Sequence, residues 1–294
     1  TIFITGAGGF LGSELVNGLS KYKYRIYFND IDFSYKIAKS KNIIKSKFNL
    51  LKKNLTIKLD KTDIFIHNAA LTKPSKFTKP NMLIDFNVQM TKNALKLAKK
   101  LNSKTFFLIS STSIYRNFQS EKYNERSRVI GIDPYSKSKI MSEEICSKFC
   151  KKHKIKFTVL RIGNIYNGNE KKKWSRNNVS LVQQWLNSLK KNITLKTSSF
   201  ENIRDWTYAK DIPRAIDSII KNNNNFKILN LVSPYLIKDI NLMKKICSNK
   251  NLLVSDNKDA INNATVSIYK SRLKFYNWTS PQRGINLIKN NEKN

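Results

Sequence analysis

The sequence of 294 residues is poor in cysteine and histidine and has no long apolar run. Its three cysteines are few and odd in number, which favours a reducing cytoplasm over a disulfide framework. Cys146 and Cys150 lie one helical turn apart, but only His67 and His153 are present to complete a metal site, so we expect free thiols and no metal. No segment reaches the roughly 18 apolar residues of a membrane-spanning helix. We therefore expect a cytoplasmic protein without a membrane partner.

Acidic residues are also scarce, at 20 against 55 lysines and arginines, and the net charge is +35. Such a charge by itself favours a nucleic acid or another anionic partner. The lysines, however, are scattered through every segment, often beside asparagine as in residues 221–226, and do not gather on one element. We therefore predict a solvated lysine surface and no nucleic-acid partner, although a positive field would still attract a phosphorylated substrate.

Short apolar runs alternate with amphipathic stretches over the first two thirds of the chain. This pattern predicts an α/β fold, with a Rossmann-type doubly wound parallel sheet and a smaller C-terminal α/β lobe. A strand-like run begins at residue 1, so we expect no signal peptide, and the missing initial Met is compatible with a trimmed chain. The predicted strands are 1–5, 24–28, 63–67, 105–110, 157–161 and 228–232, and the predicted helices are 9–21, 81–101, 135–152 and 179–189.

The first predicted strand leads directly into a glycine-rich turn and a helix. Gly6, Gly9 and Gly12 let the backbone approach a pyrophosphate, which would lie on the amides at the positive end of that helix. Asp30 follows the second strand, where a carboxylate accepts hydrogen bonds from the ribose hydroxyls of NAD and repels the additional phosphate of NADP. No arginine directly follows Asp30, so the sequence predicts NAD as the cofactor.

The alternating pattern loosens after Arg161 into a polar stretch rich in lysine and asparagine. We interpret this change as the point where the chain leaves the NAD-binding domain for a substrate-binding lobe. The predicted division gives residues 1–163 to the Rossmann domain, with 203–233 returning to it, and residues 164–202 and 234–294 to the lobe.

A serine at the end of a strand and a tyrosine–lysine pair form the candidate catalytic set. Asp133 is a predicted N-cap with Pro134 at the first helical position, so Tyr135 and Lys139 would share one helix face. An adjacent ammonium favours the phenolate and would lower the pKa of the tyrosine. We predict Tyr135 as the base, Lys139 as the residue that tunes it, and Ser111 as the residue that holds the substrate oxygen.

The same spacing occurs a second time, at Tyr35 and Lys39. This copy follows Asp30 closely, and no strand that ends in serine precedes it. We interpret it as a chance surface pattern at the adenosine end of the site.

Taken together, these motifs resemble the extended branch of the short-chain dehydrogenase/reductases, the NAD-dependent epimerase/dehydratase family that acts on sugar nucleotides. Further matches follow in order along nearly the whole chain. They are residues 63–70, Asn87, residues 160–168, residues 204–208 with Asp211, and residues 273–278.

The resemblance implies roles for single residues and a homodimer. Asn164 would touch the diphosphate of the substrate, Arg204 would contact phosphate, and the paired alanines with Asn87 would lie beside the cofactor. The expected substrate-binding residues are Ser111, Asn164 and Arg204, and the expected cofactor-binding residues are Gly6, Gly9, Phe10, Leu11, Gly12, Asp30, Asn49, Leu50, Ala69, Ala70, Asn87, Tyr135 and Lys139.

Some positions depart from the family pattern. Thr112 and Ser113 stand where the 4,6-dehydratases of the family have Asp-Glu, which disfavours water elimination. No cysteine or histidine lies near Ser111 to move carbon-bound protons, which disfavours a 3,5-epimerising reductase. Asn49 replaces a frequent aspartate near adenine, and Arg116 replaces the usual glycine.

The resulting hypothesis is an NAD-dependent nucleotide-sugar epimerase that oxidises and re-reduces C4 of the sugar through a transient 4-keto intermediate. A nucleotide-sugar 4-ketoreductase or dehydrogenase that releases its NAD(P) fits the sequence nearly as well. A cofactor-sensing or nucleic-acid-binding protein on the same fold is a remote alternative, which is motivated by the charge and disfavoured by the presence of Ser111, Tyr135 and Lys139.

Overall fold

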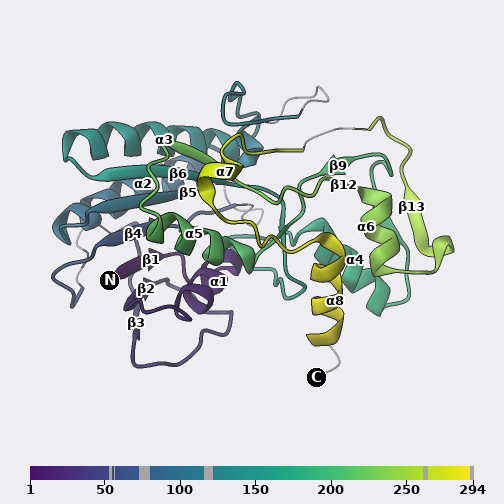
Figure 1. Ribbon diagram of the computed structural model, residues 1–294, viewed down its shortest axis with the longest axis horizontal. Coiled ribbons are helices and arrows are strands. Elements are labelled where there is room, and N and C mark those ends of the chain that lie inside the picture. The colour runs from purple at the N-terminus through teal and green to yellow at the C-terminus, as the bar shows by residue number, and fades with distance from the viewer. Residues whose placement is uncertain (53–54, 56, 73–79, 116–121, 261–263, 292–294) are drawn as a thin grey trace.

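The computed structural model of the chain describes residues 1–52, 55, 57–72, 80–115, 122–260 and 264–291. Its centre is a seven-stranded parallel sheet (Figure 1). The expected doubly wound parallel sheet is therefore confirmed. Across the sheet the strands are β11 (Ile228–Leu231), β6 (Lys156–Ile162), β5 (Thr105–Ser111), β4 (Ile64–His67), β1 (Ile2–Thr5), β2 (Ile26–Asn29) and β3 (Ile43–Ser46).

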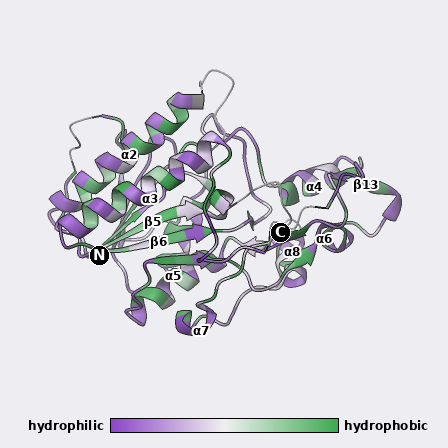
Figure 2. Cartoon of the chain, turned by 90° about the horizontal axis from the view of Figure 1, so that it is seen from above, coloured by the Kyte–Doolittle hydropathy of each residue, from purple (hydrophilic) through white to green (hydrophobic). Residues whose placement is uncertain are grey.

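Helices cover both faces of this sheet and bury its central strands on both sides. In β1, Ile2 and Ile4 pack into the cluster that contains α1 (Phe10–Leu19) and α5 (Asp211–Lys221). Phe3 points to the other face, as the two-residue period of a strand requires, and packs into a different cluster. Helices α2 (Pro80–Lys100) and α3 (Pro134–Lys152) contribute to that cluster and lie side by side (Figure 2).

Two elements of this layer were not predicted. Strand β3 has only Ile43 and Ile44 as apolar residues in a segment flanked by lysines, and it lies half-buried at the sheet edge. Helix α5 has Pro213 in its first turn, where a proline is tolerated, but this residue weakens the helical signal. The described part of residues 30–63 contains no helix, so the chain runs from β2 to β3 and on to β4 through irregular segments.

A third cluster of buried side chains lies beyond the carboxyl ends of the central strands. It is rich in aromatic residues, with Tyr166, Trp185, Trp206 and Tyr208. The elements of this region, which we call the lobe, are α4 (Leu181–Lys190), α6 (Asp239–Ile246), α8 (Pro281–Asn291), and the short strand pairs β7 (Ile165–Tyr166) with β10 (Thr207–Tyr208), β9 (Ile203–Arg204) with β12 (Ile237–Lys238), and β8 (Leu195–Thr197) with β13 (Leu253–Ser255).

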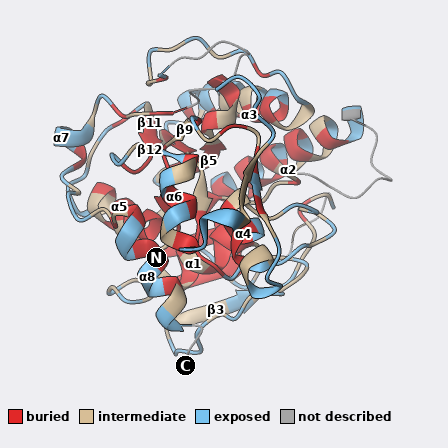
Figure 3. Ribbon diagram, turned by 90° about the vertical axis from the view of Figure 1, so that its right-hand side faces the viewer, coloured by how far each residue is buried: buried red, intermediate tan, exposed pale blue. Residues whose placement is uncertain are grey.

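The C-terminal part of the chain contributes both to the cluster that contains Ile2 and Ile4 of the sheet and to the cluster of the lobe. Leu273, at the end of the short helix α7 (Lys270–Leu273), is buried in the cluster of the sheet, and Trp278 packs against the same cluster. Ile285 and Ile288 of α8 belong to the lobe. Figure 3 shows that α2 and α3 carry buried residues beside exposed ones.

The division of the chain into domains stays a prediction.

Among the described residues, no helix is long and apolar enough to cross a membrane.

Candidate active site

One large cavity, of about 950 Å³, opens at the carboxyl ends of the central strands. The strand order reverses between β1 and β4, so the loops after these strands diverge and leave a crevice there. Residues from the lobe line the opposite side. Among the residues predicted from the sequence, the cavity is lined by Gly6, Gly9, Phe10, Leu11, Asp30, Asn49, Leu50, Ala69, Ala70, Ser111, Tyr135, Lys139, Asn164 and Arg204.

The glycine turn has the shape that a pyrophosphate needs. Gly6 has a positive φ of 68°, and a Cβ at Gly12 would lie 1.9 Å from the carbonyl oxygen of Gly6, so both glycines are required by the fold itself. A Cβ at Gly9 would make only an ordinary contact, at 3.4 Å from that same oxygen. Gly9 is also the N-cap of α1 and offers no side chain to the helix amides. The turn therefore leaves open the space and the donors that fit the phosphates of NAD.

Two of the predicted cofactor residues, Gly12 and Asn87, do not line the cavity but support its wall. The Asn87 side chain accepts a hydrogen bond from the Leu71 N–H at 2.8 Å and donates to the Leu71 carbonyl at 2.9 Å. It also donates to Ser138 on α3 at 2.9 Å. Asn87 thus fixes the loop after β4 against the catalytic helix.

Asp30 is held beside the glycine turn by backbone donors. Its carboxylate accepts hydrogen bonds from the N–H groups of Gly8 at 2.9 Å, Ile31 at 2.7 Å and Asp32 at 3.2 Å. Burial raises the pKa of Asp30, against the lowering effects of these bonds and of Lys173. Because a carboxylate has about four acceptor positions, Asp30 keeps capacity for a ribose hydroxyl.

The start of α3 brings the catalytic candidates together. As predicted, Asp133 caps the helix: its side chain accepts from the Ser136 N–H at 3.0 Å, and the Ser136 hydroxyl accepts from the Asp133 N–H at 3.1 Å. The Lys139 ammonium donates to the Ile109 carbonyl of β5 at 2.8 Å and lies 5.6 Å from the centre of the Tyr135 ring. Ser111, at the end of the same strand, is hydrogen-bonded to Tyr135.

The expectation that Lys139 lowers the pKa of Tyr135 is wrong for the protein alone. Burial raises the pKa of Tyr135 to about 12, and the opposing effects come from Arg176 and from the hydrogen bond with Ser111. Burial also lowers the pKa of Lys139 to about 8, which Glu143 opposes. Both groups have lost hydration, and the ammonium is bound to a backbone carbonyl rather than to the phenol.

The sequence analysis did not predict the buried ion pair between Arg161 and Glu143, which lies behind the catalytic residues. Arg161 donates to the Glu143 carboxylate from Nε at 3.1 Å and from Nη2 at 2.6 Å, and the Ser110 hydroxyl donates to it at 2.5 Å. The two side chains are only 5% and 11% exposed. Glu143 follows Lys139 by one helical turn, a spacing that was visible in the sequence, but its partner comes from the distant strand β6.

At the lobe end of the cavity, Arg204 is oriented by a buried carboxylate. Its Nε donates to both oxygens of Asp239, at 3.0 and 3.2 Å, and Asp239 is fully buried. No described residue accepts a hydrogen bond from the two terminal nitrogens of this guanidinium. Asp205, the neighbour in sequence, instead accepts from the Asn164 side chain at 2.9 Å. Arg204 therefore lines the cavity with its terminal nitrogens available to an anion.

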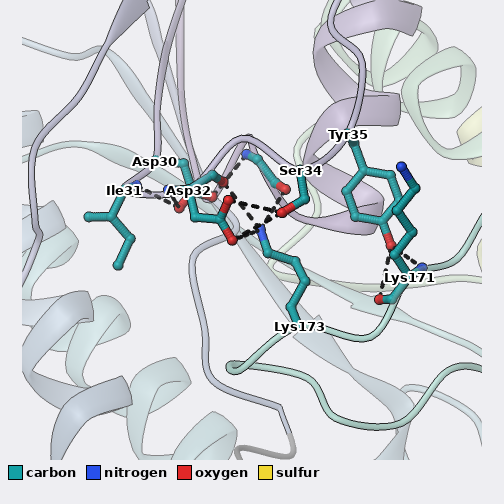
Figure 4. Close-up of polar contacts among 8 residues, drawn as sticks. Asp30, Ile31, Asp32, Ser34, Tyr35, Lys171 and Lys173 are labelled. Atoms are coloured by element: carbon teal, nitrogen blue, oxygen red, sulfur yellow. Dashed lines mark hydrogen bonds and ion pairs between the residues drawn. The ribbon is translucent and has the colours of Figure 1, made fainter.

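The sequence analysis did not predict a role for residues 170–178, which follow β7 and contribute to the cavity wall. Lys173 of this segment is nearly buried and is ion-paired with Asp32 at 3.1 Å (Figure 4). Tyr35 accepts a hydrogen bond from the Lys171 N–H at 2.7 Å and donates to the Lys171 carbonyl at 3.3 Å. Tyr35 lines the cavity near Asp30, whereas Lys39 is exposed, and the interpretation of their spacing as a chance pattern stays a prediction.

The remaining predictions concern the cysteines, a metal site and Arg116. Cys146 and Cys150 are buried free thiols on α3. The part of the chain that the structure describes holds no group of three or more His, Cys, Asp or Glu residues that could bind a metal ion. Arg116 lies outside the described residues.

Comparison with known proteins identifies the family. Residues 2–231 match the model of the NAD dependent epimerase/dehydratase family. The chain belongs to this family. The resemblance of the sequence to the extended short-chain dehydrogenase/reductases is thereby confirmed, and so is the expectation of NAD as the cofactor.

Individual relatives in the family are distant. A dTDP-D-glucose 4,6-dehydratase of Dictyostelium discoideum is 26% identical over 83% of this chain, and the match spans only 61% of that protein. A Bacillus subtilis protein described as an uncharacterized UDP-glucose epimerase is 25% identical over 74% of this chain and 72% of its own length. The crystal structure of a UDP-glucuronic acid 4-epimerase from Bacillus cereus, in complex with NAD, has a TM-score of 0.80 at 20% identity, with 98% of this chain and 96% of that chain covered.

Proposed function

We propose that this chain is a nucleotide-sugar 4-epimerase that uses NAD. The observation that carries the proposal is a single cavity with three parts. The glycine turn and Asp30 lie at one end, Ser111 and Tyr135 lie in the middle, and Arg204 lies at the lobe end. Such a cavity suits a dinucleotide and a second phosphorylated molecule that meet at a tyrosine.

The chain's own residues would perform the proton transfer. The glycine turn and Asp30 would hold NAD, which would supply the hydride acceptor and donor for the sugar carbon. Ser111 would hold the reacting hydroxyl, and Tyr135 would take its proton and later give it back. Because burial keeps Tyr135 protonated in the protein alone, a nearby cation is needed to stabilise the phenolate, and Arg176 is the cation whose charge opposes the rise in the pKa of Tyr135.

The substrate would be anchored through its diphosphate. Arg204 offers its terminal nitrogens to the cavity, and its Nε is fixed by Asp239, so little freedom of the guanidinium is lost when an anion binds. Asn164, beside it on the cavity wall, is oriented by Asp205. A planar guanidinium that is already oriented matches two phosphate oxygens better than a neutral sugar.

Residues beside Ser111 favour epimerisation over dehydration. Thr112 and Ser113 line the cavity, and the Ser113 hydroxyl is buried without a hydrogen-bond partner among the described residues. A hydroxyl with an ordinary pKa is a poor replacement for the carboxyl groups that eliminate water. We therefore propose no dehydratase activity for this chain, although the Dictyostelium relative is named a 4,6-dehydratase.

A nucleotide-sugar 4-ketoreductase or dehydrogenase is the second candidate, since it would use the same residues and differ by releasing its cofactor. The decisive experiment incubates the purified protein with UDP-glucose, dTDP-glucose and UDP-glucuronic acid without added cofactor. We expect conversion of one of them into its 4-epimer without a net change in absorbance at 340 nm, and a conversion that is about 10²–10⁴-fold slower with Tyr135→Phe. Net NADH formation in a parallel incubation with added NAD would establish the dehydrogenase instead, and tight salt-dependent binding of duplex DNA would revive the nucleic-acid alternative. The homodimer and the cytoplasmic location stay predictions.

A further inference from the structure

The segment 170–178 forms a compact turn that reaches from the lobe to the cofactor end of the cavity. Lys173 and Arg176 exchange two backbone hydrogen bonds, each of 3.0 Å, which close the turn. At its base, the buried Glu170 accepts hydrogen bonds from Arg176 Nη2 and from the Ser180 N–H, both at 2.8 Å. Glu170 also donates its own N–H to Gln183 on α4 at 2.9 Å. The turn is therefore a built element with a fixed base.

One side of this turn is attached to the loops after β1 and β2. The Lys173 ammonium donates to the carbonyl of Gly8 at 2.9 Å and to that of Asp32 at 3.2 Å, and it is ion-paired with the Asp32 carboxylate (Figure 4). Only 8% of the Lys173 side chain is exposed. The Tyr35 hydroxyl adds the two hydrogen bonds with the backbone of Lys171.

The other side is attached to the loop after β4, across the crevice. There the Thr72 N–H donates to the Ser175 carbonyl at 3.0 Å. The glycine turn after β1 and the loop after β4 are the two walls between which a dinucleotide lies in folds of this class. The turn consequently bridges the crevice from wall to wall.

The turn also adds positive charge to the crevice. The Arg176 guanidinium lies 5.3 Å from the ring centre of Phe10, next to the glycine turn, and its charge opposes part of the rise that burial causes in the pKa of Tyr135. Lys173 acts on Asp30 in the same way. A diphosphate between these cations and the amides of α1 would find positive groups on two sides.

We propose that residues 170–178 are a clasp that closes over the bound dinucleotide and keeps it in the protein between turnovers. The ligand is the diphosphate and ribose part of the dinucleotide. The proposal rests on the proposed function, because an epimerase returns the hydride within the same site and gains from a retained cofactor. Release would require the contacts of Lys173, Tyr35 and Thr72 to break, so we expect slow exchange.

The test measures dinucleotide release directly. The protein is loaded with NADH, excess NAD is added, and the loss of bound NADH fluorescence gives the release rate. We expect Lys173→Met to release NADH at least ten times faster than the unmodified chain. The matched control is Lys172→Met, because the neighbouring Lys172 is exposed and takes no part in the turn contacts described above, and it should release NADH at the original rate. Equal rates for Lys173→Met and the unmodified chain would overturn the clasp.

Hydrogen exchange on the unmodified protein tests the clasp even if Lys173→Met fails to fold. The Arg176 N–H is bonded within the clasp, to the Lys173 carbonyl, and the Lys171 N–H is bonded from the clasp to the Tyr35 hydroxyl. We expect NAD to slow their exchange at least tenfold, and no change would overturn the clasp. These outcomes are distinct from failure of the proposed function. Fast release with intact epimerisation at high NAD removes only the clasp, whereas slow release without any epimerisation removes only the function.

Discussion

Replacing Arg204 tests the substrate assignment most directly. Arg204→Ala would remove the two terminal nitrogens that face the cavity, and charge-assisted hydrogen bonds to a diphosphate contribute about 1.5–3 kcal/mol. Since about 1.4 kcal/mol corresponds to a factor of ten, KM should rise roughly tenfold to a hundredfold. We expect a smaller change in kcat if the diphosphate is held equally in the ground state and the transition state.

The same substitution also affects stability, because Asp239 would lose its cation. Breaking a buried ion pair costs roughly 3–5 kcal/mol, but here Arg204 is partly exposed, and Asp239 keeps donors from Thr197 at 2.8 Å and Asn202 at 3.2 Å. We therefore expect a loss below that range. Asp239→Asn is the matched control, since it disturbs the pair but keeps the guanidinium.

The assay compares initial rates with a nucleotide sugar and with the matching sugar 1-phosphate. For the unmodified protein, kcat/KM should be much higher with the nucleotide sugar, and Arg204→Ala should reduce that difference. Asp239→Asn should lower the melting temperature with a smaller effect on KM. Similar kcat/KM values for both substrates in the unmodified protein would refute the role of Arg204 and, with it, the sugar-nucleotide assignment.

Other predictions concern the cofactor and the catalytic pair. Tyr135→Phe should lower turnover by about 10²–10⁴-fold while NAD binding, measured by calorimetry, is kept, whereas an equal loss in Tyr35→Phe would reject the choice between the two tyrosines. Asp30→Ala should reduce the preference for NAD over NADP in the same measurement, and equal affinities in the unmodified protein would reject Asp30 as the selecting residue. Burial lowers the pKa of Lys139 from 10.5 to about 8. Between these two pH values the unfolded chain binds more protons than the folded protein, so the free energy of unfolding should rise with pH there. Denaturant titrations of Lys139→Met should lack that rise, and the same slope in both proteins would contradict the shifted pKa.

The sequence predicted the central strands well because burial on both faces produces nearly continuous apolar runs. Strand β1, with Ile2, Phe3 and Ile4, is fully buried and is recognisable from these three residues alone. Helix α3 was located from Asp133 and Pro134, because a capping residue acts on its own next turn and needs no distant partner. Features that depend only on neighbours in the chain were thus predictable.

Features that depend on distant partners were not. The pKa of Tyr135 rises because the folded protein buries it, and the residues around a helix start do not reveal how deeply that start will be buried. The partner of Glu143 is Arg161 on another strand, and that of Arg204 is Asp239 in the lobe rather than its neighbour Asp205. In each case the burial or the partner is set by the tertiary structure and not by the residues nearby in the sequence.

The roles of single lysines also depend on distant partners and could not be predicted from the sequence. Interpreting the charge of +35 as a solvated surface suits residues such as Lys172, which is exposed. It does not suit Lys173, whose side chain is 8% exposed and bonded to the glycine turn, or Lys139, which is buried under Tyr135. Neighbouring lysines in one run cannot be told apart by composition, because only burial and the polar groups around each ammonium distinguish them. In a chain with so many lysines, a functional lysine must therefore be identified from its contacts, and Lys173 was found only in that way.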